Sequence, residues 1–271
     1  MDDTNSNFQN FIVQLRRHYP QVFDVAQLLA DDYTHSLQQI GNRKGNLEIE
    51  ASFGKILYNS SGTKYCNNAL PQDVTREIIE VLSTFGGWSS ISDWFLVYDY
   101  DLGDRKRVRV SYENQTQSIS CITKEPLFSR DIGYDEQSTQ TWKLRECTTR
   151  INTKFEVQNT YTEDKLLEFK NVRISMRKYF VVPSNNIPTI SWSLEIIQSW
   201  YGKTLADAEL KMLKDPPECR FECEIVNLPT TDQLTRIQKI LLFSSFILKI
   251  QDLFDIPNTI HSSPLPFFKL L

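Results

Sequence analysis

The sequence predicts an α+β protein in which a large antiparallel sheet closes into a β-barrel flanked by helices. From Trp94 to Val226, polar and apolar residues alternate with the period of two that is typical of strands. Before and after this region, apolar residues recur at helical spacing. The first and last predicted strands both carry alternating glutamates, which favours a barrel that brings these two strands together.

Helices are predicted where apolar residues recur on one face and where proline or glycine marks a boundary. The predicted helices are Phe8–Leu15, Val25–Ile40, Pro71–Phe85, residues 202–214 and Asp232–Phe254. The last of them is expected to have its N-cap at Thr230 or Thr231, because threonine is a favoured capping residue.

The predicted strands are separated by turns rich in Gly, Asn, Asp and Pro. They are Leu47–Phe53, Phe95–Tyr100, Arg107–Glu113, Ser118–Lys124, Thr141–Arg150, Asn152–Thr160, Glu168–Val182, Ile190–Trp200 and Phe221–Ile225. The chain is therefore expected to comprise an N-terminal helical segment (1–45), a β-barrel domain (46–227), and a C-terminal helix and tail packed on the barrel (228–271).

Composition narrows the class of protein. The chain has 271 residues, of which 40% are hydrophobic, and this is enough for one large domain with helical additions. The net charge of −4 excludes a generally basic surface, so any site for a polyanion must be local. No secretory signal or membrane-spanning stretch is evident. The five cysteines include no CxxC pair, and Cys219 and Cys223 share one strand face, so we expect buried, reduced thiols in an intracellular protein.

Two strands distant in the sequence each place two carboxylates on one face. Residues two apart in a strand point to the same side. Glu48 and Glu50 therefore share one face of the first strand, and Glu222 and Glu224 share one face of the last. Four carboxylates on adjacent strands would repel one another unless a cation lay between them. Oxygen ligands suit hard divalent cations such as Mg²⁺ or Mn²⁺, so the pattern predicts a metal site between the first and last strands.

Other strands carry cations at alternating positions. These residues are Arg105, Arg107, Arg109, Lys124, Lys143, Arg145, Arg173 and Arg177. Any one of these strands alone fits a solvated outer face. All of them together with the acidic strands favour a single lumen, in which a polyphosphate would lie between a metal and the cations.

Six segments resemble, in chain order, the motifs of one known family. They are Leu47–Gly54, Arg107–Ser111, Ile122–Lys124, Arg173–Phe180, Trp192–Ile196 and Phe221–Ile225. The family is that of the metal-dependent RNA 5′-triphosphatases of mRNA capping in fungi, protozoa and large DNA viruses, which are triphosphate tunnel metalloenzymes. The resemblance covers about residues 46–227. The chain departs from the family pattern at Ser52, where arginine is usual, at Ser175, where lysine is usual, and at Arg220, where a third glutamate often stands.

The resemblance implies a closed eight-stranded antiparallel tunnel that hydrolyses the 5′-triphosphate end of nascent RNA. It implies that Glu48, Glu50, Glu222 and Glu224 surround Mg²⁺ or Mn²⁺, and that Glu195 orients the attacking water. The phosphate-binding residues that it implies are Arg107, Arg109, Lys124, Lys143, Arg145, Arg173 and Arg177. Of these, Arg109, Lys124, Arg173 and Arg177 are expected to clamp the reacting phosphates.

Two alternatives remain open at this point. The first is a tunnel-fold enzyme for small polyphosphates or free nucleotides, and the second is a non-catalytic tunnel-fold module in a transcription complex. The C-terminal helix is expected on the outside of the barrel, or in contact with an RNA guanylyltransferase or with a second subunit of a homodimer. The apolar end Phe267–Leu271 suggests a longer capping polypeptide. The resemblance implies a nuclear protein, or a cytoplasmic one if the source is viral, and no membrane partner.

Overall fold

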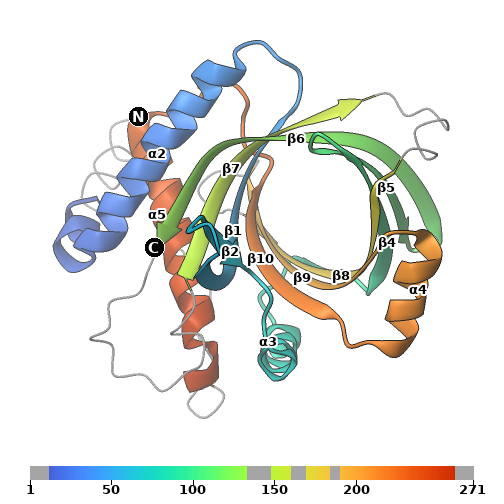
Figure 1. The fold of residues 1–271 in the computed structure, drawn as a ribbon. Helices are drawn as coiled ribbons and strands as arrows, with labels where there is room; N and C mark the ends of the chain where they lie inside the picture. The colour runs from blue at the N-terminus through green and yellow to red at the C-terminus, as the bar shows by residue number, and fades with distance from the viewer. Residues whose placement is uncertain (1–11, 133–147, 160–168, 184–189, 260–271) are drawn as a thin grey trace. The chain divides into compact units, whose positions relative to one another are not determined.

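The computed structural model describes residues 12–132, 148–159, 169–183 and 190–259. Its strands form a closed antiparallel β-barrel (Figure 1). Eight strands pair in the order β10-β9-β8-β4-β5-β6-β7-β1, and pairing of β1 with β10 closes the ring. The barrel strands are β1 (Asn46–Tyr58), β4 (Phe95–Gly103), β5 (Lys106–Glu113), β6 (Thr116–Ile132), β7 (Thr148–Asn159), β8 (Asn171–Pro183), β9 (Ser191–Gly202) and β10 (Glu218–Val226). The predicted α+β barrel of eight strands is confirmed.

Two short strands extend the barrel sheet at its margins. Strand β2 (Lys64–Asn67) pairs with the end of β1, and β3 (Ser90–Ile91) pairs with β8. Helix α3 (Gln72–Thr84) lies between them in the chain, where the sequence predicted a helix. Helix α4 (Leu205–Lys214) packs on β9 and β8, and the Thr204 hydroxyl caps it by accepting from the Asp207 N–H at 3.2 Å.

Two strand predictions were wrong in their limits. Strand β6 does not end at Lys124 but continues to Ile132, because a register shift between Pro126 and Phe128 accommodates the proline within the ladder. The sequence predicted one strand ending at Arg150 and another beginning at Asn152. Strand β7 is continuous across this point, because Ile151 is buried and pairs with Ala51 of β1.

Each strand of the closing pair separates apolar from charged residues. Along β10, Cys219, Phe221, Cys223 and Ile225 are buried, and the residues between them face the other side. Along β1, Leu47, Ile49, Ala51 and Phe53 are likewise buried, and Phe53 stacks on Phe221 with ring centroids 5.3 Å apart. The period of two therefore directs the glutamates of both strands into the lumen. Both cysteines, Cys219 and Cys223, are buried in the apolar layer, as predicted.

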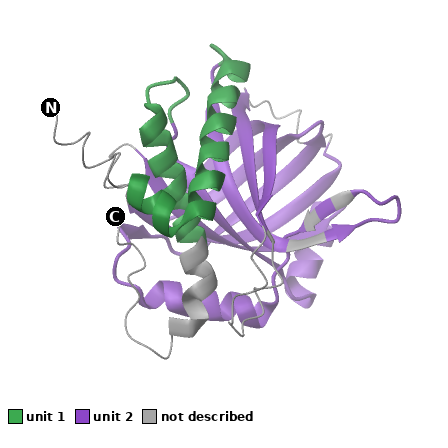
Figure 2. Cartoon of the chain, turned by 90° about the vertical axis from the view of Figure 1, so that its left-hand side faces the viewer, with its two compact units in different colours: residues 1–43, 229–271 green, residues 44–228 purple. Residues whose placement is uncertain are grey.

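The two ends of the chain form a second compact unit, composed of residues 1–43 and 229–271 (Figure 2). Within it, helix α2 (Pro20–Ile40) packs against helix α5 (Arg236–Thr259). The Tyr33 hydroxyl donates to the Pro229 carbonyl at 2.7 Å, and the Tyr33 and Phe243 rings meet edge to face. In the described parts of the chain, no helix is long and apolar enough to cross a membrane.

Helix α5 begins later than predicted, at Arg236. Its N-terminus is a capping box, because the Thr235 hydroxyl accepts from the Gln238 N–H at 3.3 Å and the Gln238 side chain accepts from the Thr235 N–H at 2.9 Å. This reciprocal pair satisfies two helix donors, whereas Thr230 and Thr231 lie outside the helix. The prediction of a cap at Thr230 or Thr231 was therefore wrong.

Replacing Gly54 by alanine is expected to destabilise the barrel by about 1–3 kcal/mol. A β-carbon at this position would lie 2.2 Å from the carbonyl oxygen of Asn67, so backbone would have to move. Urea denaturation measures the effect. Gly86→Ala is the matched control, since a β-carbon there meets nothing within 4 Å. Equal stability of the two variants would contradict the close approach of β1 to the chain after β2.

Candidate active site in the tunnel lumen

The barrel lumen holds a cavity of about 500 Å³ that is lined mainly by charged side chains. Its carboxylates are Glu48, Glu50, Glu156, Glu195, Glu222 and Glu224. Its cations are Arg107, Arg109, Lys124, Arg150, Lys154, Arg173, Arg177 and Arg220. Both signs of charge therefore line one cavity, which is an arrangement suited to a charged ligand.

Strand register brings the glutamates together. Glu50 lies opposite Glu224, and Ser52 lies opposite Glu222, where β1 meets β10. Glu222 in turn lies opposite Glu195 of β9. Three adjacent strands thus present their carboxylates to the same part of the lumen.

Burial, together with the neighbouring negative charges, raises the pKa values of two carboxyl groups. Burial raises the pKa of Glu222 to about 7, and the charges of Glu50 and Glu195 add to the increase. Burial also raises the pKa of Glu224 well above its ordinary value, and the charge of Glu48 contributes. A divalent cation among these oxygens would stabilise the charged forms.

Two lysines neutralise part of this acidic wall. The Lys124 ammonium bonds to Glu48 and lies 3.2 Å from Glu156, and Lys154 bonds to Glu50. Among the residues that the structure describes, no three His, Cys, Asp or Glu side chains are arranged to hold a metal ion. The donor set still fits Mg²⁺ or Mn²⁺, because it consists of carboxylate oxygens whose like charges are incompletely compensated. A bound cation would compete with the lysines for Glu48 and Glu50.

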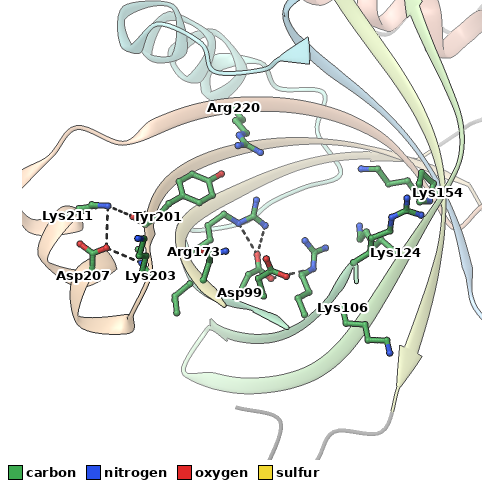
Figure 3. Close-up of a pocket in the computed structure, with 17 residues that line it drawn as sticks. Asp99, Lys106, Lys124, Lys154, Arg173, Tyr201, Lys203, Asp207, Lys211 and Arg220 are labelled. Atoms are coloured by element: carbon green, nitrogen blue, oxygen red, sulfur yellow. Dashed lines mark hydrogen bonds and ion pairs between the residues drawn. The ribbon is translucent and has the colours of Figure 1, made fainter. Parts of the chain in front are cut away.

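The opposite wall is organised around one aspartate, Asp99 of β4, which lies among four arginines. Figure 3 shows Asp99 beside one of them, Arg173. Arg109 Nε donates to Asp99 Oδ1 at 2.8 Å, and Arg173 also bonds to this carboxylate. Arg177 Nη2 donates to Asp99 Oδ2 at 3.3 Å, and Arg107 Nε lies 3.7 Å from Oδ1. A single carboxylate thus holds guanidinium groups from β5 and β8 side by side.

Positive charge exceeds negative charge in this cluster. Burial alone would raise the pKa of Asp99, but Arg109, Arg173 and Arg107 outweigh it and hold the pKa well below its ordinary value. Burial and the charge of Arg109 lower the pKa of Arg107 to about 10. The Nε of Arg107 is buried and has no hydrogen-bond partner among the described residues. The cluster can therefore accept additional anionic oxygens, such as those of a phosphate.

Glu195 lies at the boundary between the two walls. Its Oε1 accepts from Arg177 Nη1 at 2.8 Å, and its strand neighbours are Glu222 and Tyr179. Glu195 is only 7% exposed, so this ion pair is largely shielded from solvent. The contact holds the Glu195 carboxylate between the basic cluster and the acidic wall.

Most residues singled out from the sequence meet in this lumen. They are Glu48, Glu50, Arg107, Arg109, Lys124, Arg173, Arg177, Glu195, Glu222 and Glu224. Two others, Lys143 and Arg145, lie outside the described residues. Arg105 is not among the lumen residues and lines a second cavity instead.

Sequence reasoning missed Asp99 and the charged face of β7. Arg150, Asn152, Lys154 and Glu156 alternate along β7 and line the lumen, a signal that was hidden when the strand was divided near Ile151. Arg150 lies directly opposite Ser52, so a cation is present beside the position where the resembling family has arginine.

Comparison with solved structures supports the fold. The Schizosaccharomyces pombe RNA triphosphatase Pct1 aligns with a TM-score of 0.57 at 14% identity, over 86% of this chain and 92% of that one. The Mimivirus capping enzyme triphosphatase aligns with a TM-score of 0.50 at 14% identity, over 83% and 96%. A chain of the S. pombe Mediator head module aligns with a TM-score of 0.42 at 9% identity, over 77% and 94%, which is too weak to support an argument. No protein-family model and no curated protein matches the sequence.

Fold and lumen together define a class. The chain is a closed eight-stranded tunnel protein with a charged lumen. It shares the tunnel fold of the RNA triphosphatases of S. pombe and Mimivirus, at an identity that establishes the fold alone.

Proposed function

We propose that this protein is a metal-dependent RNA 5′-triphosphatase, which removes the γ-phosphate from the 5′-triphosphate end of nascent RNA as the first step of mRNA capping. One observation carries the proposal: a single lumen has carboxylates on one wall and an arginine cluster with uncompensated positive charge on the other. Phosphoryl transfer depends mainly on positioning and on stabilising negative charge, and fixed charges of both kinds supply these.

The basic wall binds the triphosphate. Arg109, Arg173 and Arg177 are already oriented by Asp99, so little reorganisation is needed when phosphate oxygens arrive. Lys124 lies between the walls and extends the clamp along the lumen. Arg107 contributes a buried donor, its Nε, which has no hydrogen-bond partner in the part of the chain that the structure describes.

The acidic wall holds the metal ion and orients the attacking water. Glu48, Glu50 and Glu224 would hold the metal ion, with Glu222 as a further ligand or as a close neighbour. Bound Mg²⁺ or Mn²⁺ supplies Lewis-acid stabilisation of the charge on the γ-phosphate. Glu195, held by Arg177, accepts a hydrogen bond from the attacking water. Attack breaks the bond between the γ-phosphorus and the bridging oxygen, which leaves a 5′-diphosphate end and inorganic phosphate.

Phosphate release from triphosphate-ended RNA tests the proposal. With Mg²⁺ or Mn²⁺ we expect one phosphate per RNA end in a malachite-green assay, a 5′-diphosphate product, and no release in EDTA. The same RNA with a 5′-hydroxyl end is the control. Failure to release phosphate with either metal would favour a non-catalytic tunnel module instead.

The substrate comparison separates the two enzymatic alternatives. Hydrolysis of RNA ends and of tripolyphosphate is measured under the same conditions. Higher kcat/KM on RNA is the expected result. Faster hydrolysis of tripolyphosphate would assign the lumen to a polyphosphatase, because the same charges also suit a free polyphosphate.

A further inference from the structure

We infer that a second cavity, at the basic mouth of the tunnel, binds the first nucleotides of single-stranded RNA, so that the RNA enters this mouth with its 5′ end leading. The inference rests on the proposed function, since it assigns a place to the part of the substrate that follows the triphosphate. We call this cavity the vestibule; Asp101, Arg105, Lys106, Tyr201, Lys203 and Lys211 are among its residues that do not line the lumen (Figure 3).

The vestibule is large and adjoins the lumen. Its volume is about 840 Å³, and five of its lining residues also line the lumen. These shared residues are Arg107, Lys124, Lys154, Arg173 and Arg220. Pockets of roughly 300–1,000 Å³ bury one drug-sized ligand, so this volume has room for about one or two nucleotides beyond the triphosphate.

Charge in the vestibule favours a polyanion. Nine of its lining residues are lysine or arginine and only three are aspartate. One of the aspartates, Asp99, is already surrounded by arginines, and another, Asp207, lies 3.4 Å from Lys211. The whole chain has a net charge of −4, so this concentration of cations is local and not a general property of the surface. A succession of cations leading into the lumen suits a phosphodiester backbone.

An aromatic ring lies among these cations. Tyr201 is 36% exposed and points into the vestibule, where the Arg220 guanidinium lies over its ring, 5.6 Å from the centroid (Figure 3). Arg173, which bonds to Asp99, is its partner across β8 and β9. Bases of single-stranded RNA stack on aromatic rings and on arginine planes, and this combination distinguishes an RNA site from one for tripolyphosphate alone.

The end of β9 that carries Tyr201 is held in place before any ligand binds. Lys211 Nζ of α4 donates to the Tyr201 carbonyl at 2.8 Å. The Lys203 N–H donates to Asp207 at 3.1 Å, which ties the following turn to the same helix. Arg220 is oriented by Glu218, whose Oε1 accepts from Arg220 Nε at 2.7 Å. The stacking surface therefore needs little ordering when a base arrives.

Binding of 5′-triphosphate RNAs of one, two, four and eight nucleotides tests the inference. Fluorescence anisotropy in EDTA avoids hydrolysis during the measurement. We expect affinity to rise from one to about two or four nucleotides and then level off, since the vestibule is of limited size. Affinity that is the same at all lengths, or equal to that of tripolyphosphate, would overturn the inference.

Substitutions in the vestibule test which side chains contact the RNA. Tyr201→Ala is expected to weaken binding of the four-nucleotide RNA about tenfold, the scale of removing one base–aromatic stack, and to leave tripolyphosphate binding unchanged. Tyr201→Phe should retain affinity. Tyr112→Ala is the matched control, because Tyr112 is similarly exposed at 43% and lines neither cavity. Equal weakening of RNA and tripolyphosphate binding in Tyr201→Ala would show a structural role only and would contradict the assignment.

A second variant covers the case in which Tyr201→Ala does not fold. In Lys106→Gln/Lys203→Gln, the slope of log affinity against log salt should fall by about 1.4 for RNA, or about 0.7 for each phosphate that is no longer neutralised. An unchanged slope would exclude these lysines from the RNA path and contradict the inference. Length-dependent binding without phosphate release would uphold the vestibule and reject the proposed catalysis. Phosphate release without length-dependent binding would uphold the proposed catalysis and reject the vestibule as an RNA site.

Discussion

Replacing Glu48 or Glu224 by alanine is expected to lower phosphate release from triphosphate-ended RNA by at least about 100-fold, the scale of losing a principal electrostatic stabiliser. Glu48 and Glu224 lie on the two strands that close the barrel, and both line the lumen. If they hold the metal, each substitution removes an oxygen ligand and one of the negative charges that attract the cation. The malachite-green assay measures the decrease.

Metal binding gives a readout that does not depend on turnover. Calorimetric titration with Mn²⁺ should show weaker binding in both variants than in the unmodified protein. Glu113→Ala is the control, since Glu113 is an exposed carboxylate at the end of β5 and lines neither cavity. Wild-type-like turnover with unchanged Mn²⁺ binding in Glu48→Ala and Glu224→Ala would remove the metal assignment.

Replacing Asp99 by asparagine is expected to lower the free energy of unfolding by about 3–5 kcal/mol, the range for removing one partner of a buried ion pair. Asp99 is 5% exposed and contacts four guanidinium groups. Asparagine keeps the shape but leaves those groups without their shared negative charge. Urea denaturation measures the change. Asp131→Asn is the control, because Asp131 pairs with Arg150 at an exposed position, where about 1 kcal/mol or less is expected.

The contribution of Asp99 should also have a defined pH range. Its pKa in the folded protein lies well below its ordinary value, so the stabilisation is complete above the unfolded pKa of about 3.9 and is lost as the pH falls through the folded pKa. The stability difference between the unmodified protein and Asp99→Asn should be constant from about pH 5 to 8 and shrink in more acid solution.

Added tripolyphosphate distinguishes charge from packing in the Asp99 variant. If the cluster is a phosphate site, the anion should raise the melting temperature of Asp99→Asn more than that of the unmodified protein, since it replaces the missing negative charge. No stabilisation of either protein by tripolyphosphate would argue against phosphate binding at these arginines.

Local pattern was sufficient to predict most of the barrel strands and the faces on which their charged residues lie. The alternation of Glu48 with Glu50 and of Glu222 with Glu224 placed each pair on one side of a strand, and the structure places all four in the lumen. The arginines of β5 and β8 were assigned to the same space by the same reasoning. These features follow from the two-residue period of a strand, which can be read from the order of the residues without knowledge of the fold.

The predicted limits were wrong where the end of a strand depends on pairing with another strand, or where several residues could cap a helix. Strand β6 passes Pro126 because β7 pairs with it across a register shift, and no residue of β6 alone reveals that partner. The capping box of α5 was present in the sequence as Thr235 and Gln238, but an earlier threonine was preferred.

The amino-acid pattern alone therefore established the α+β class, the strand faces and the two sets of opposing charges. Only the folded chain showed that Asp99 organises four arginines, that β7 contributes Lys154 and Arg150, and that a basic vestibule with Tyr201 opens beside the lumen. The physical reason is that side-chain direction is set by local backbone geometry, whereas neighbours are set by register between strands distant in the chain. Glu50 and Glu224 meet because the barrel closes, and closure is a property of all eight strands together.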